Sequence, residues 1–267
     1  MKTLYILLAF LCGIVSAKAQ KASEKNTKNS TNTLFTAGLA NTLIGGLYDG
    51  YYKYSDLKKH GNFGLGAPDK LDGELIILDG KIYQTQHSGK TFEVQDTAKT
   101  PFSVVNFFKV DKSIKIKREM NKNQLFQYLD SVLVNLNGMY AIHLRGDFKY
   151  IKTRAFPPVD KKPYTPLAQM LSKQAFFEFK NQKGDFVGHR LPPYMEGANI
   201  AGYHLHFISD KKDKGGHIID FLTENVTVEI DLLNSFIVDV PTTYDFNHFD
   251  FSKDLKNDVK SVENGQK

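Results

Sequence analysis

Three histidines stand close together late in the chain, and their spacing could hold a metal ion. His204 and His206 alternate within Gly-Tyr-His-Leu-His-Phe (202–207), which is typical of a β-strand, so both side chains point to one face. The Asp-, Lys- and Gly-rich stretch 209–216 predicts a turn, and His217 opens the apolar run that follows. A hairpin would return His217 across from the pair. Three converging neutral imidazoles are typical of a catalytic divalent metal site with a position left for substrate.

The triplet also has a plainer interpretation. A His-x-His pair arises by chance on exposed strands, and a single histidine is usually a surface residue or a hydrogen-bonded core residue. If the triplet does bind zinc, its ligands are all neutral, so the ion keeps its full charge and suits an anionic, oxygen-chelating substrate. His143 and His189 lack a paired spacing, and we interpret both as structural or surface residues. His87, beside Ser-Gly, is interpreted as a turn residue, and His248 is expected to pack in its aromatic stretch.

The N-terminus predicts export. Lys2, the apolar run 4–15 and Ala-Lys-Ala at 17–19 together predict a signal peptide over residues 1–19. The apolar run is too short to span a bilayer comfortably, so we expect no membrane association after cleavage. Residues 20–33 are polar and predict a disordered leader. The protein is therefore expected to be secreted or periplasmic, in a bacterium.

Composition narrows the classes of function. Cys12 is the only cysteine and lies in the signal peptide, so the mature chain has neither a disulfide nor a cysteine nucleophile. The net charge of +6 falls to +4 once Lys2 and Lys18 leave. The lysines are scattered, with no basic stripe interleaved with aromatics, which argues against nucleic-acid binding. No Ser/His/Asp or Cys/His nucleophilic signature is visible.

The elements that must position the histidines are mostly strands. Residues 34–51 carry leucines at steps of four and predict a helix, and residues 123–136 predict an amphipathic helix. Asp79-Gly80 between apolar runs predicts one hairpin, and Arg-Gly-Asp at 145–147 another. The remaining strand candidates are 102–108, 114–117, 175–180, 185–189, 203–208, 217–222, 227–230 and 236–240.

This pattern predicts the fold class α/β (mixed α+β), with two sheet-based lobes, mixed β-sheets and flanking helices. We divide the mature chain into an N-terminal α/β domain at residues 34–160 and a C-terminal metal-binding domain at residues 161–267. Ser252 is expected to cap a last helix that runs toward Val262.

Several longer strings resemble the α-acetolactate decarboxylase family, in order and without large gaps from about residue 34 to the end. They are Leu-Tyr-Asp-Gly at 47–50, His-Gly-Asn-Phe-Gly-Leu-Gly at 60–66, Leu-Asp-Gly-Glu-Leu-Ile-Ile-Leu-Asp-Gly at 71–80, Lys-Thr-Arg at 152–154, Lys-Pro-Tyr at 162–164, the run 197–207, and Gly-Gly-His at 215–217.

The resemblance implies a zinc enzyme that converts 2-acetolactate to acetoin and carbon dioxide, in a two-domain α/β subunit that we expect to form a homodimer. The family's metal ligands fall on the three histidines, and such a site also tolerates other divalent ions. The glutamate of its Leu-Asp-Gly-Glu string falls on Glu74 and its arginine on Arg154. A second glutamate near the family's C-terminus is matched nearest by Glu263.

Such a site suits decarboxylation without an organic cofactor. The ketone, hydroxyl and carboxylate of 2-acetolactate can chelate a metal, and zinc would polarise the ketone and stabilise the enediolate left when carbon dioxide departs. Arg154 would offer its planar donors to the carboxylate or to developing oxyanion charge. Glu74 or Glu263 would protonate the enediolate from one face. Without the resemblance, Glu74 is better interpreted as an ordinary exposed strand residue, and Arg154 could be a structural ion-pair partner. Glu263 could equally be charge on a helix surface.

Two positions depart from the family's usual pattern. Where the family usually reads Gly-Leu-Gly-Thr-Phe, this chain has Ala67 and Pro68 in the last two places, so a hydroxyl is lost. If that position lines the pocket, substrate orientation or product stereochemistry would change. Leu191 replaces a residue that is often serine, which we regard as less consequential.

Two other functions compete with the decarboxylase. A cupin-like metal-dependent dioxygenase or isomerase acting on a small oxyacid would also use His-x-His and a later histidine. Cupins usually add a glutamate soon after the pair, and residues 207–210 read Phe-Ile-Ser-Asp instead. A non-enzymatic exported protein that binds sugars or surfaces is the third possibility, supported by the tyrosine and phenylalanine content.

Overall fold

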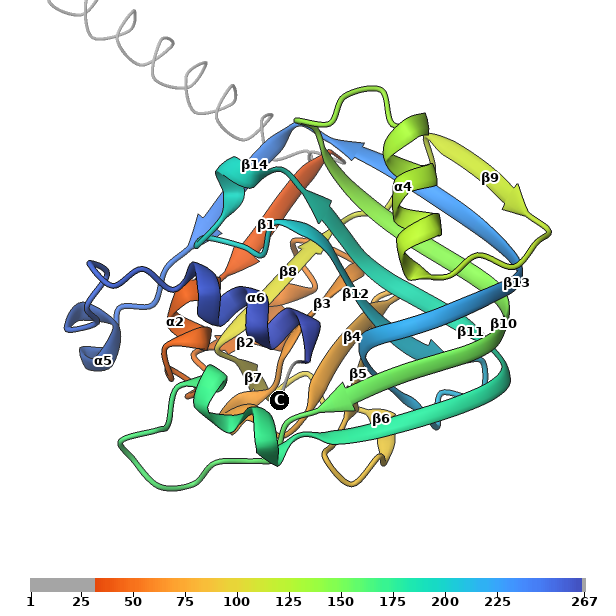
Figure 1. Cartoon of the computed structure of the whole chain (residues 1–267). Coiled ribbons are helices and arrows are strands. Elements are labelled where there is room, and N and C mark those ends of the chain that lie inside the picture. The colour runs from red at the N-terminus through yellow and green to blue at the C-terminus, as the bar shows by residue number, and fades with distance from the viewer. Residues whose placement is uncertain (1–31, 266–267) are drawn as a thin grey trace, which may run out of the picture. The chain divides into compact units, whose positions relative to one another are not determined.

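Two β-sheets packed face to face organise residues 32–265, the part of the chain that the computed structural model describes (Figure 1). The seven-stranded sheet has the order β14-β1-β8-β3-β4-β5-β6, and the five-stranded sheet the order β10-β11-β12-β13-β9. Strands of the first are β1 (Thr33–Ala37), β3 (Phe63–Ala67), β4 (Glu74–Leu78), β5 (Lys81–Thr85), β6 (Thr91–Glu93), β8 (Phe102–Asn106) and β14 (Ser235–Asp239). Strands of the second are β9 (Lys112–Ile116), β10 (Met139–Ala155), β11 (Ala175–Leu191), β12 (Gly202–Ser209) and β13 (Gly215–Leu233).

Short helices flank the sheets, as the predicted mixed α+β class requires. A small ladder pairs β2 (Tyr52–Lys53) with β7 (Lys99–Thr100). The α-helices are α2 (Ala40–Ile44), α3 (Tyr54–Leu57), α4 (Lys122–Val132), α5 (Tyr244–Asn247) and α6 (Lys256–Asn264), and the 3-10 helices are η1 (Asp69–Leu71), η2 (Leu167–Lys173) and η3 (Pro193–Met195). Among the described residues, no helix is long and apolar enough to cross a membrane.

The five-stranded sheet closes on itself. β10 pairs with β11 on one edge and β13 on the other, while β12 bridges β11 and β13. Aromatic side chains fill the space that this closure creates. The rings of Phe148 and Phe186 stack with their centroids 4.0 Å apart, and Phe221 meets Phe186 edge-on at 5.1 Å. This packed interior fixes the positions of β12 and β13, which carry the histidines.

The alternation of side chains along β4 sets the direction of a key carboxylate. Ile76 belongs to the core between the two sheets, while Leu75 and Ile77 pack on the opposite face with Tyr54 of α3. Because successive side chains of a strand point to opposite faces, Glu74 shares the face of Ile76 and points toward the five-stranded sheet.

The helix predicted over residues 34–51 is wrong in its first part. Thr33–Ala37 form β1, which pairs with β14 and β8, and only Ala40–Ile44 are α-helical. Gly38 separates the two elements with φ +76°, and a Cβ there would lie 2.1 Å from the Pro101 carbonyl oxygen. Residues 33–37 form a strand because they pair with two neighbouring strands, and this pairing outweighs the helical periodicity of the leucines. The periodicity correctly predicts only the short helix that follows.

The hairpin predicted around residues 145–147 is also wrong, because β10 runs unbroken through them. Gly146 has φ +142° and is followed by a register shift against β13 between Asp147 and Phe148. A glycine beside a bulge bends a strand that must wrap around a closed sheet, and in sequence it looks like a turn. β11 and β13 likewise each join two predicted strands, because both pair with β10 along nearly its whole length.

The Asp-Gly hairpin is confirmed. Asp79 and Gly80 both have positive φ, and Leu78 pairs with Lys81 across the turn. The predicted signal peptide and the predicted leader up to residue 31 lie outside the described residues. The division of the chain into domains at residue 160 stays a prediction, as does the homodimer.

Candidate metal centre

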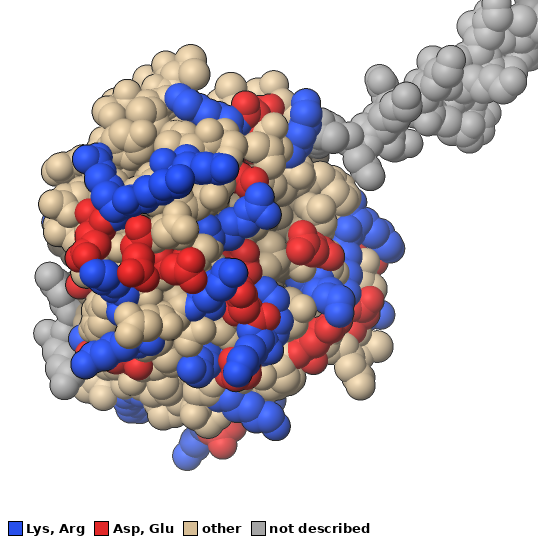
Figure 2. Space-filling view, turned by 90° about the vertical axis from the view of Figure 1, so that its right-hand side faces the viewer, with Lys and Arg blue, Asp and Glu red and all other residues tan. Residues whose placement is uncertain are grey.

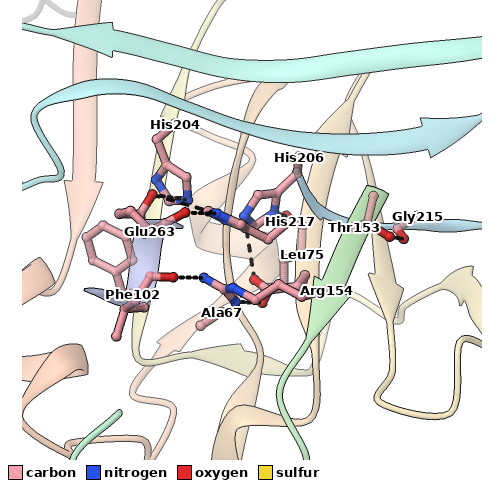
Figure 3. Close-up of polar contacts among 12 residues, drawn as sticks. Ala67, Leu75, Phe102, Thr153, Arg154, His204, His206, Gly215, His217 and Glu263 are labelled. Atoms are coloured by element: carbon pink, nitrogen blue, oxygen red, sulfur yellow. Dashed lines mark hydrogen bonds and ion pairs between the residues drawn. The ribbon is translucent and has the colours of Figure 1, made fainter. Parts of the chain in front are cut away.

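The three histidines converge as their spacing predicts. His204 and His206 lie on β12, and His206 is paired directly with His217 of β13, which confirms the hairpin. The ring centroids are 5.1 to 5.3 Å apart. All three side chains are buried, and one ligand atom from each lies within 4.8 Å of the others. Figure 3 shows the rings gathered around a common point with Glu263 beside them.

Burial keeps these imidazoles neutral. It lowers the pKa of His204 to about 3, with a smaller contribution from the nearby cation of Arg154. Burial also places the pKa values of His206 and His217 well below the ordinary value. Neutral imidazoles have free lone pairs at pH 7, which is the form that binds metal ions.

One contact fixes the orientation of the His206 ring. Its Nδ1 lies 2.8 Å from the backbone oxygen of Leu75, so Nδ1 carries the proton and donates it. The lone pair then resides on Nε2, a buried atom with no hydrogen-bond partner among the described residues. A backbone carbonyl that holds the far nitrogen of a histidine is typical of metal sites. The donor set therefore fits a divalent metal ion.

A buried ion pair lies directly beside the triad. Arg154, near the end of β10, places Nη1 2.5 Å from Oε1 of Glu74, and the two side chains are 3% and 8% exposed. The other carboxylate oxygen of Glu74 lies 3.5 Å from Nε2 of His206. Burial raises the pKa of Glu74 to about 7, although Arg154 opposes the shift. A carboxyl group with this pKa can hold or release a proton near neutral pH.

Arg154 retains capacity for a further partner. Its Nη2 donates to the backbone oxygen of Val262 at 3.3 Å, and its guanidinium lies 4.7 Å from the ring centroid of Phe156. Its Nε is buried without a hydrogen-bond partner among the described residues. A buried donor left unpaired is costly, and an anionic oxygen would satisfy it.

Glu263 reaches the triad from the C-terminal helix. Its Oε2 lies 3.8 Å from Nε2 of both His204 and His217. Burial raises its pKa to about 7, against the lowering effect of Arg154 and then Lys122. Helix α6 is held over the site because Val259 and Val262 pack into a core cluster with residues of α2 and η2.

A cavity of about 30 Å³ joins these groups. The three histidines, Glu74, Arg154 and Glu263 all line it, so the structure brings together every residue that the sequence nominated. Ala67 also lines it, which places the departure from the family pattern inside the site. Leu191 instead belongs to the core between the sheets.

The remaining histidines lie elsewhere. His189 is buried with Nε2 3.0 Å from Oδ1 of Asn106, and His143 pairs with Asp185 at 2.9 Å. Motif analysis missed the apolar wall of the cavity, because such residues carry no chemical signature in sequence. This wall comprises Leu43, Ile44, Leu71, Phe102, Phe156, Leu167, Ile200 and Val262.

Comparison with known proteins decides the family. The sequence profile of the α-acetolactate decarboxylase family matches residues 34–253. The chain belongs to the α-acetolactate decarboxylase family. The α-acetolactate decarboxylase of Methanosarcina mazei is 37% identical over 89% of this chain and 82% of its own length. That of Bacillus subtilis strain 168 is 34% identical over 91% of this chain and 97% of its own length.

Solved structures of the α-acetolactate decarboxylase family agree with the fold. The crystal structure of the enzyme from B. subtilis strain 168 superposes with a TM-score of 0.84 at 34% identity, covering 86% of this chain and 99% of that chain. A Staphylococcus aureus protein of unknown function, described as similar to α-acetolactate decarboxylase, gives a TM-score of 0.82 at 28% identity, covering 88% and 100%. The predicted family and fold class are therefore confirmed.

Proposed function

We propose that this protein converts 2-acetolactate to acetoin and carbon dioxide with a divalent metal ion held by His204, His206 and His217. We propose zinc as this metal. One observation supports this most directly. In a chain of the α-acetolactate decarboxylase family, three neutral buried imidazoles lie beside a buried arginine and two carboxyl groups whose pKa values are near 7.

The residues of the site have complementary roles. A bound zinc ion would supply Lewis-acid polarisation of the substrate ketone. Arg154 would orient the carboxylate of the substrate and stabilise developing oxyanion charge with its unpaired Nε–H. Its Nη groups, which donate to Glu74 and to the backbone oxygen of Val262, hold the guanidinium in place and add positive charge. The bond to the carboxylate carbon breaks, and its electron pair passes toward the ketone oxygen to leave an enediolate. A proton then adds to carbon and gives acetoin.

Either glutamate can supply that proton. Burial raises the pKa of both Glu74 and Glu263 to about 7, which favours the protonated form of each carboxyl group. They approach the site from different elements, β4 and α6, and so deliver a proton from different directions. Delivery from one side only would make the product chiral.

Acetoin formation from racemic 2-acetolactate tests the proposal. Purified residues 20–267 are assayed untreated, stripped with a chelator and restored with zinc, with metal content measured alongside. We expect activity to vanish on stripping and to return with zinc. His204→Ala should be inactive, while the exposed His248→Ala should behave as wild type. Acetoin release without oxygen uptake excludes the dioxygenase. A metal-loaded protein that makes no acetoin would refute the proposal.

Export and dimerisation also remain our proposals. If residues 1–19 are removed during export, the protein recovered from the culture medium or periplasm of the native host should begin at Gln20 by mass spectrometry. A chain that keeps Met1 inside the cell would contradict this.

We also propose a homodimer. Sedimentation of the purified protein should give the mass of two chains, and a single-chain mass would refute the homodimer.

A further inference from the structure

A second and much larger cavity adjoins the metal centre. Its volume is about 620 Å³, against about 30 Å³ for the cavity that holds the triad. Ile200, His217 and Glu263 line both cavities and so form the wall between them. The outer cavity is large enough to admit a molecule of the size of 2-acetolactate before it reaches the triad.

Lysines from two helices line the outer cavity. Lys256 and Lys260 lie one turn apart on α6, and Glu263 follows them along the same side of the helix. Lys122 opens α4 and donates from Nζ to the backbone oxygen of Ile219 at 2.9 Å. The helix side that carries the lysines therefore leads to the carboxyl group that faces the triad.

The rest of the lining strengthens the field of these lysines. Phe126, Tyr203 and Leu205 supply mostly apolar wall, which lowers the local dielectric and concentrates field lines in the cavity. Two acids also line it. They are Glu263 and Glu196, and Glu196 accepts a hydrogen bond from the backbone N–H of Ala201 at 3.3 Å. The three lysines therefore outnumber the acids.

The surface elsewhere is arranged differently. On the face shown in Figure 2, positive and negative side chains are interspersed across the whole view. Ion pairs between described residues include Lys149–Glu119 and Lys152–Glu178. By contrast, none of the three cavity lysines forms a salt bridge with another described residue. Their charge is therefore available to an incoming anion.

We propose that the outer cavity is the approach chamber of the enzyme, and that Lys122, Lys256 and Lys260 draw the anionic substrate through it toward Glu263 and the metal centre. The inference rests on the proposed function for the identity of the substrate. The chamber itself requires only that a small carboxylate is the molecule that reaches the triad.

Charge reversal tests the chamber in the holoenzyme. In Lys256→Glu/Lys260→Glu we expect kcat/KM for 2-acetolactate to fall roughly tenfold at low salt, through KM, while kcat changes less than about twofold. Screening should shrink the difference to less than about twofold at roughly 0.5 M salt. The matched control Lys115→Glu/Lys253→Glu makes the same net charge change at exposed positions outside the cavity, and it should stay close to wild type. Equal losses in both double variants, or a loss that salt does not relieve, would overturn the chamber.

A second readout separates the chamber from the proposed function. The zinc-loaded protein is challenged with dipicolinate, an anionic chelator, and with 1,10-phenanthroline, which is neutral. Lys256→Glu/Lys260→Glu should slow zinc release by dipicolinate about tenfold and leave release by phenanthroline unchanged. If the wild-type protein makes no acetoin but the double variant still slows release by dipicolinate alone, the proposed substrate is wrong and the chamber is supported. Equal effects on both chelators would refute the chamber even in an active enzyme.

Discussion

Arg154 and Glu74 form a buried ion pair that joins the two sheets beside the histidine triad. Arg154 comes from β10 of the five-stranded sheet and Glu74 from β4 of the seven-stranded sheet, with 2.5 Å between Nη1 and Oε1. Water cannot replace either partner where the side chains are almost fully buried. Removal of one charge therefore leaves the other uncompensated, and the pair couples the packing of the sheets to the chemistry of the site.

Glu74→Gln should lower both stability and activity. The uncompensated charge of Arg154 should reduce the free energy of unfolding by about 3 kcal/mol. Loss of a proton-transfer group should reduce kcat by about 100-fold or more. Chemical denaturation and acetoin assays measure the two effects. The control is Glu93→Gln on β6, whose exposed pair with Lys81 should contribute less than about 1 kcal/mol. If Glu74→Gln is as stable as Glu93→Gln, the buried pair of Arg154 and Glu74 does not stabilise the fold as we expect.

Glu263→Gln should separate catalysis from metal binding. Three histidines still hold the ion, so zinc content should match wild type, while kcat should fall about 100-fold if Glu263 is the proton donor. Elemental analysis and acetoin assays on the same sample give both values. Glu119→Gln, at an exposed ion pair with Lys149, is the matched control. Full activity in Glu263→Gln would assign proton delivery to Glu74.

Asp231 should make stability fall as pH rises through its folded pKa. It lies between the sheets, where Oδ2 accepts hydrogen bonds from Asn106 and from the backbone N–H of Lys109. Burial raises its pKa to about 6 from the ordinary value of 3.8. Because the folded pKa exceeds the unfolded one, the folded state binds the proton more tightly between these values. The resulting stabilisation is complete below about pH 4 and is lost as pH rises through 6.

Asp231→Asn should therefore change the pH profile of unfolding. Relative to wild type, the variant should gain on the order of 1 kcal/mol of stability between pH 4 and pH 7, because asparagine stays neutral where the wild-type carboxyl group must ionise. Urea unfolding at several pH values measures this difference. Asp79→Asn, at an exposed turn where asparagine tolerates positive φ, is the control and should run parallel to wild type. Parallel curves for Asp231→Asn would refute the prediction.

Ala67→Thr should alter substrate handling, because Ala67 lines the inner cavity. A restored hydroxyl adds one hydrogen-bonding group beside the substrate, which is worth up to about tenfold in kcat/KM or in the preference between acetolactate enantiomers. Chiral chromatography of residual substrate and of acetoin measures both. Leu191→Ser offers a contrast, because Leu191 packs between the sheets. It should lower stability by about 2 kcal/mol or more and leave enantiomer preference unchanged.

Local patterns predicted the parts of the site that lie within one hairpin. The alternation of His204 and His206 and the turn before His217 follow from strand geometry, which is a property of neighbouring residues. The same local logic failed at Gly146, where a bent strand has the sequence of a turn, and at β1, where pairing with β14 and β8 outweighs leucine periodicity. Glu74 and Arg154 were nominated by the family resemblance, since nothing near either residue in the chain indicates that they meet.

The sequence by itself determined the family, the histidine triplet and the strand-rich class, because these depend on residue types and on short-range periodicity. Only the tertiary structure decided that Glu74, Arg154 and Glu263 surround the triad, since they come from β4, β10 and α6 and meet through the packing of two sheets and a helix. Packing also decided the inner cavity and the larger cavity beside it. The burial that packing creates raises the pKa values of both glutamates and keeps the histidines neutral, and no local pattern of residues encodes that environment.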